Sequence, residues 1–85
     1  RADAEGKGYV TEAVSGITDF AFGTLKAERV EIRCDSLNVR SAAVAERCGY
    51  SYEATCRRVR RGAQDEICDL TMTSLIRSEW TAQHP

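Results

Sequence analysis

Two glycines near the start of the sequence, Gly6 and Gly8, precede a segment whose apolar residues have helical spacing. Glycines let backbone amides approach an anion closely, and a helix N-terminus adds unpaired N–H donors and a partial positive charge. A pyrophosphate is the natural ligand of such a loop. It is not a Walker A loop, because Lys7 is followed by glycine, and it lacks the third glycine of a dinucleotide fingerprint. A tight turn that feeds a helix is the alternative interpretation.

A second candidate lies at Asn38, which precedes an Ala-rich segment free of Gly and Pro. Asn38 is suited to cap a helix there, because its side chain can accept a hydrogen bond from the Ser41 amide. Ser41 would then lie in the first turn, where a hydroxyl often bonds the backbone. Gly49 is suited to end this helix in the left-handed conformation, followed by apolar Tyr50.

The four cysteines do not have the spacing of a metal site. They are not arranged as CxxC, and the only histidine is His84, so we predict no metal. Most of them fall in apolar segments, where a free thiol acts as a small buried hydrophobe, and a reduced, cytoplasmic protein is the default. If a hairpin turns at Gly62, Cys56 and Cys68 lie almost opposite each other, and a disulfide between them is an alternative.

The elements that position these residues alternate between helix and strand periodicities. We predict helices over 9–25 and 38–48, strands over 29–34, 50–59 and 67–74, a hairpin turn over 60–65, and a short turn or helix over 75–82. The first helix should bury one face: Val10, Ala13, Val14, Ile17, Phe20, Ala21 and Leu25. The order predicts an α/β (α+β) fold with a mixed, mostly antiparallel sheet, against whose hairpin Trp80 packs.

Length and charge narrow the class of protein. With 85 residues the chain forms one small domain, and a net charge of −1 argues against nucleic acid as the main partner. No apolar run approaches the roughly 20 residues that cross a membrane. The basic stretch Arg57 to Arg61 invites an RNA-binding interpretation, but a solvated edge or a substrate-facing lip is more typical without stacking aromatics.

The motifs together resemble the GNAT superfamily of N-acetyltransferases over nearly the whole chain. The matching stretches are Gly6 to Ala13, Asp19 to Phe22, Arg29 to Arg33, Asn38 with Ser41, Glu46 to Tyr50, Tyr52 to Arg58 and Asp69 to Trp80. The last two resemble the final strands of the RimJ/RimL-like (ribosomal-protein-alanine N-acetyltransferase) branch. The resemblance identifies residues 1–85 as a partial domain, the C-terminal, acetyl-CoA-binding half.

The resemblance also implies site residues. Acetyl-CoA would be held by backbone amides of the glycine loop and by Asn38, which matches the residue that bonds the pantetheine arm; the loop residues are Gly6, Lys7, Gly8, Tyr9, Val10 and Thr11. Ser41 matches a residue proposed to protonate the departing thiolate, so it is the candidate catalytic residue. It is also, with Asn38, a candidate to bind the cofactor. The sequence departs from the family pattern at Glu5 and at Val10. It also departs at Ala45, where many members have a Tyr that acts as the general acid.

The implied function is transfer of an acetyl group from acetyl-CoA to a primary amine, with a protein N-terminus or a small molecule as acceptor. In the family, the base and the oxyanion donor come largely from the strand before the glycine loop and from the N-terminal half, so the resemblance implies that both lie there. Glu12, Glu46 and Glu53 are predicted to be solvated surface carboxylates. The alternative is a non-catalytic GNAT-like module that binds CoA or a protein. An unpaired edge on the strand Val30 to Cys34 would favour a homodimer.

Overall fold

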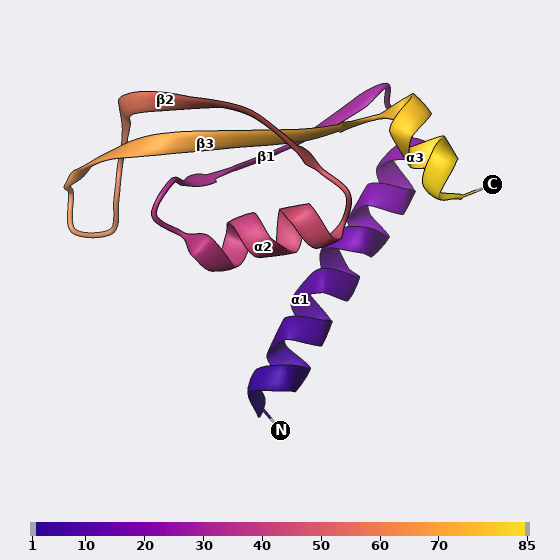
Figure 1. Ribbon diagram of the computed structural model, residues 1–85, viewed down its shortest axis with the longest axis horizontal. Helices are drawn as coiled ribbons and strands as arrows, with labels where there is room; N and C mark the ends of the chain where they lie inside the picture. The colour runs from indigo at the N-terminus through magenta and orange to yellow at the C-terminus, as the bar shows by residue number, and fades with distance from the viewer. Residues whose placement is uncertain (1, 85) are drawn as a thin grey trace.

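The computed structural model describes the chain from Ala2 to His84, and the surroundings of its side chains from Tyr9 onward. The elements follow the predicted order and confirm the α+β class (Figure 1). They are α1 (Ala2–Asp19), a π-helical turn η1 (Phe20–Thr24), β1 (Arg29–Asp35), α2 (Val39–Arg47), β2 (Ser51–Arg61), β3 (Ile67–Ile76) and α3 (Arg77–Gln83). No helix of the described residues is both long and apolar enough to cross a membrane.

The three strands form one sheet in the order β1-β3-β2, and both pairings are antiparallel. The expected mixed sheet is therefore wrong for the described residues, because the hairpin return places β3 between two strands that both run against it. β1 pairs with β3 continuously, from Arg29 opposite Ile76 to Asp35 opposite Leu70. Because β1 is an edge strand, its other side has no strand partner in the described part of the chain, as predicted.

The hairpin between β2 and β3 is irregular. Cys56 lies opposite Leu70, but Arg60 lies opposite Cys68, so three β2 residues lie opposite Asp69 alone in an irregular bulge. The predicted register, with Cys56 opposite Cys68, is wrong because of these inserted residues. All four cysteines have free thiols in the structure.

The core lies where α1 ends, between the helices and the sheet. Phe22 and Leu75 are fully buried, with Ala45 and Tyr50 beside them. The predicted buried face of the first helix is therefore largely wrong. Thr18 and Phe22 are buried, whereas Val10, Ala13 and Ile17 in α1, Phe20 in η1 and Leu25 after it are exposed. Thr18 is buried because its hydroxyl bonds the Tyr50 hydroxyl at 2.6 Å, a pairing that apolar periodicity does not encode.

The last helix, α3, closes the same end of the molecule, far from the tip of the hairpin (Figure 1). Trp80 stacks on Phe22 with ring centroids 5.4 Å apart, and its indole N–H donates to Asp19 at 2.8 Å. The predicted packing of Trp80 against the hairpin holds only at the end of β3, where Trp80 packs on the core cluster that contains Leu75. Arg77 donates to the Phe22 and Ala27 carbonyls, which fixes the start of α3 to the end of η1.

Candidate functional site

The turn between β1 and α2 is built by short polar contacts. The Asp35 carboxylate accepts from the Leu37 amide at 2.9 Å, and the Asp35 carbonyl accepts from the Asn38 amide at 2.9 Å. Asn38 caps α2 as predicted, since its Oδ1 accepts from the Ser41 amide at 3.1 Å. Because the cap uses only the oxygen of Asn38, the side-chain Nδ2 can donate to a ligand carbonyl at the exposed start of α2.

The same turn is tied to the hairpin through Asp69. The Ser36 amide donates to the Asp69 carbonyl at 3.0 Å, and the Asp69 carboxylate accepts from the Arg58 amide at 2.8 Å. Arg58 has a φ of 58°, a left-handed conformation that is strained for a residue other than glycine. A hollow of about 740 Å³ is lined by Arg57, Arg58 and Asp69. The bulge therefore places Arg57 and Arg58 along an open hollow that Asp69 connects to the turn leading to Asn38.

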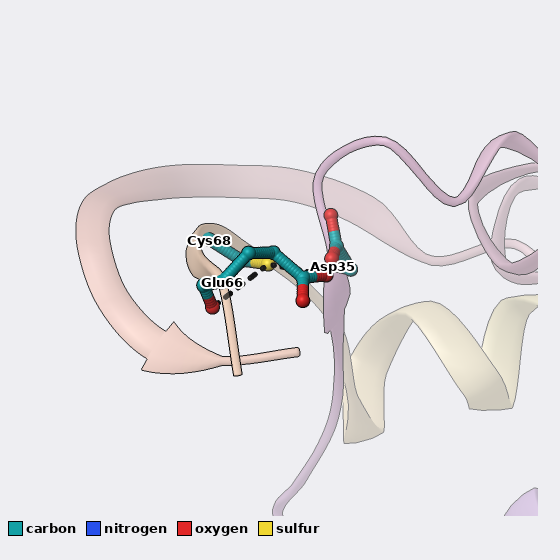
Figure 2. Close-up of side chains that lie close together, drawn as sticks. All are labelled: Asp35, Glu66 and Cys68. Carbon is teal, nitrogen blue, oxygen red and sulfur yellow. Dashed lines mark hydrogen bonds between the residues drawn. The ribbon is translucent and has the colours of Figure 1, made fainter. Parts of the chain in front are cut away.

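Three further side chains converge close to the turn of the hairpin. Asp35, Glu66 and Cys68 place their ligand atoms within 4.8 Å of one another (Figure 2). The Cys68 thiol donates to the Glu66 carboxylate at 3.6 Å, and the same carboxylate accepts from the Gln64 amide at 2.9 Å. The Asp35 carboxylate, with burial and the charge of Glu66, raises the pKa of Cys68 to about 11. The arrangement thus holds a protonated thiol between two carboxylates.

Protein groups around this cluster compete with a bound cation. The Leu37 amide, then the Cys68 thiol and the positive charge of Arg60, lower the pKa of Asp35, so this carboxylate is already neutralised in part by protein groups. Asp, Glu and Cys can all ligate a divalent ion, but binding would have to displace the thiol proton and overcome Arg60. The cysteine spacing gave no sign of the cluster, because it forms only when β1 and β3 pair.

The comparisons with known proteins agree on one family. Residues 1–51 match the family model described as "Acetyltransferase (GNAT) domain". The chain belongs to the GNAT acetyltransferase family. The Bacillus subtilis protein named "Probable N-acetyltransferase YjcK" is 40% identical over 53 residues, which cover 62% of this chain and 29% of that protein.

Solved structures of GNAT proteins have the same fold. A probable acetyltransferase superposes with a TM-score of 0.82 at 36% identity, over 89% of this chain and 42% of that one. A provisionally assigned ribosomal-protein-serine acetyltransferase from Vibrio cholerae gives a TM-score of 0.72 at 34% identity, over 87% of this chain and 42% of its own. The chain spans less than half the length of each of these relatives.

The glycine loop of this GNAT chain is helical in the structure. α1 begins at Ala2 instead of near Tyr9, so Gly6, Gly8 and Thr11 all lie inside the helix. Beyond the first four residues of a helix, each amide bonds the carbonyl four residues before it. The backbone amides from Gly6 to Thr11 are therefore directed along α1 in this conformation. Their use for a pyrophosphate stays a prediction, and it requires the helix to start later when the ligand binds.

The glycine loop contacts α2 through Thr11, but this contact does not lie at the Asn38 cap. The Thr11 carbonyl accepts from the Cys48 thiol at 3.7 Å, at the far end of α2 from Asn38. A helix of nine residues is about 13 Å long, so these two candidate regions lie at opposite ends of α2 along this contact. Tyr9 and Val10 are exposed. The surroundings of Gly6, Lys7 and Gly8 lie outside the described part of the structure.

The positions that bear on acid catalysis differ in burial. Ala45, where many GNAT proteins have a Tyr, is 1% exposed and part of the core. Ser41 is half-buried in the first turn of α2, where its backbone amide is taken by the cap and its hydroxyl is the group left for chemistry. Ser41 is thus the predicted acid that stays compatible with the geometry of α2.

The carboxylates that the sequence offered as bases are exposed or engaged. Glu12 and Glu46 are exposed, as expected. Glu53 accepts hydrogen bonds from the Ser74 hydroxyl and from Arg29, and these two contacts lower its pKa. A carboxylate held in this way is a poor proton acceptor. Sequence reasoning missed Asp69 as the residue that joins the hairpin to the α2 turn, and its position after Cys68 carried no local signal.

Proposed function

We propose that this chain is the acetyl-CoA-binding portion of an N-acetyltransferase that acts on a primary amine. The observation that carries the proposal is the match of residues 1–51 to the GNAT family, because this range contains both the glycine loop and the capped start of α2. Acetyl-CoA would supply the acetyl thioester, whose carbonyl carbon the amine attacks while the C–S bond to CoA breaks and CoA leaves as a thiolate. The free Nδ2 of Asn38 is suited to bond an amide carbonyl of the pantetheine arm, and the hydroxyl of Ser41 to donate a proton to the thiolate.

The acceptor is proposed to be a protein N-terminal amine, as in the RimJ/RimL-like branch, and the protein to act in the cytoplasm. The similarity to a ribosomal-protein-serine acetyltransferase at 34% identity supports this choice over a small-molecule amine. Because none of Glu12, Glu46 and Glu53 is placed as a base, the general base is not assigned to this chain.

A non-catalytic GNAT-like module is the second candidate. It is favoured by the helical conformation of Gly6 to Thr11 and by the buried Ala45, which leave Ser41 as the only predicted acid among the described residues. Such a module would bind CoA without releasing it as product.

Calorimetry with acetyl-CoA, followed by a thiol-release assay with peptides that carry a free N-terminus, separates the two. Saturable binding with amine-dependent thiol release supports the enzyme, and binding without release supports the module. The absence of CoA binding contradicts both. Circular dichroism in the same titration should show a loss of helix, because the amides of Gly6 to Thr11 must leave α1 to reach a pyrophosphate.

A further inference from the structure

The hairpin bulge has three features that ordinary strand pairing does not explain. Arg57, Arg58 and Val59 together face Asp69 alone, so the bulge displaces two arginine side chains from the regular sheet. Arg58 adopts a left-handed φ of 58°, and the Asp69 carboxylate holds that conformation by accepting its amide at 2.8 Å. Bulges of this kind re-aim side chains, and strained residues of this kind cluster at ligand sites. The hollow of about 740 Å³ lies where these features meet.

The arginines of the hairpin differ in the contacts that their side chains make. Arg61 donates to the Asp65 carbonyl at 3.0 Å, and the charge of Arg60 acts on Asp35. In the part of the chain whose side chains are described, no ion pair joins Arg57 or Arg58 to a carboxylate. With Asp69 as the third lining residue, the hollow has one excess positive charge, which suits a singly charged anion better than a dianion.

The location of the hollow connects it to the α2 cap. The Asp69 carbonyl accepts from Ser36, and the Asp35 carbonyl accepts from Asn38, so the bulge and the cap share one turn. A ligand that lies in the hollow is therefore adjacent to the start of α2, where the proposed pantetheine contact lies.

From these contacts we infer that Arg57 and Arg58 form a subsite for a carboxylate carried by the acceptor amine. This inference rests on the proposed acetyl transfer. It narrows the acceptor class to amines with a carboxylate close to the reactive nitrogen, such as a peptide with Asp at its second position. Paired guanidinium groups bind carboxylates by charge-assisted hydrogen bonds, which an amide side chain cannot replace.

The test compares two peptides on the unaltered chain, Ala-Asp-Ala-amide and Ala-Asn-Ala-amide, which differ by one charge. Titration followed by 15N-edited NMR should shift the amides and Nε–H signals of Arg57 and Arg58 with the Asp peptide. The Asn peptide should bind about tenfold more weakly, the size expected for loss of a charge-assisted contact. Equal affinities for the two peptides would overturn the subsite. Because both peptides are tested on the unaltered chain, the result does not depend on whether a variant folds.

Variants then separate the subsite from overall charge. Arg57→Gln combined with Arg58→Gln should remove the preference for Asp, whereas Arg61→Gln should retain it, because Arg61 is turned toward Asp65 on the same hairpin. An equal loss per charge removed in Arg61→Gln would show that net charge alone attracts the peptide, and would contradict the proposal.

The outcome for the subsite is independent of the outcome for acetyl transfer. Asp-dependent shifts at Arg57 and Arg58 without thiol release from acetyl-CoA support the subsite and contradict the enzyme. Thiol release at equal rates with both peptides, without those shifts, supports the enzyme and overturns the subsite.

Discussion

The two ends of the sheet differ in what holds them together. At the end where α1 meets α3, apolar side chains are buried: Phe22 stacks on Trp80, Leu75 is fully covered, and Thr18 and Tyr50 satisfy each other. At the hairpin end, the contacts are almost all polar, with Asp69 bonding Arg58 and Cys68 lying between Asp35 and Glu66. The first end should therefore determine whether the chain folds, and the second should determine its chemistry.

This separation has a physical reason. Buried apolar surface contributes most of the favourable free energy of a small domain, so the core tolerates few changes. Polar contacts near the surface contribute little to stability, since water replaces them at small cost. Strained or charged residues such as Arg58 can therefore be kept at the hairpin without unfolding the chain. Substitutions at the two ends should show this difference directly.

The largest effect is expected at the core. Phe22→Ala removes a fully buried ring that stacks on Trp80, and it should lower the free energy of unfolding by about 3–5 kcal/mol. The control is Phe20→Ala, since Phe20 is 54% exposed two residues away and should cost well under half as much. Urea denaturation followed by circular dichroism measures both. Equal losses would mean that burial does not determine the contribution of a side chain at this end of the molecule, contrary to the comparison.

At the hairpin, the largest effect should be on the Cys68 thiol instead of on folding. Its pKa is raised from 9.0 to about 11, so at pH 9 the thiolate fraction should be roughly fiftyfold lower than for an ordinary cysteine. The rate of iodoacetamide labelling, followed by mass spectrometry from pH 7 to 11.5, should reach half its maximum near pH 11 in the folded chain and near pH 9 in urea. The pH of the midpoint, not the rate, reports the pKa, because burial alone slows labelling without moving the midpoint.

The sign of the linkage follows from the same shift. A folded-state pKa above the unfolded value means that the neutral thiol favours folding below pH 9, and that this contribution is lost as pH rises through about 11. Asp35→Asn should move the labelling midpoint down toward 9, because Asp35 is the main cause of the shift. A midpoint that stays near 11 in this variant would assign the shift to burial.

How much the sequence revealed also differs between regions. Both ends of α2 were predicted correctly, because a cap at Asn38 and a left-handed Gly49, whose φ is 89°, depend only on neighbouring residues. The buried face of α1 was predicted wrongly, because the burial of Thr18 depends on a hydroxyl 32 residues away. The bulge at Arg58 and its contact with Asp69 were not predicted, since polar residues at a hairpin give no period from which to count register.

The smallest effect is expected at the Asn38 cap, the one local feature that stability and the proposed function share. Asn38→Ala should cost about 1 kcal/mol, because the Ser41 amide loses its acceptor. Asn38→Ser keeps an acceptor oxygen and should lose only a few tenths of that, but it removes the Nδ2 donor proposed for the pantetheine arm. Calorimetry with acetyl-CoA should then show several-fold weaker binding in both variants, although only Asn38→Ala melts earlier. If Asn38→Ser binds acetyl-CoA as tightly as the unaltered chain, Asn38 serves only as a helix cap, and the turn before α2 contributes to stability and not to acetyl-CoA binding.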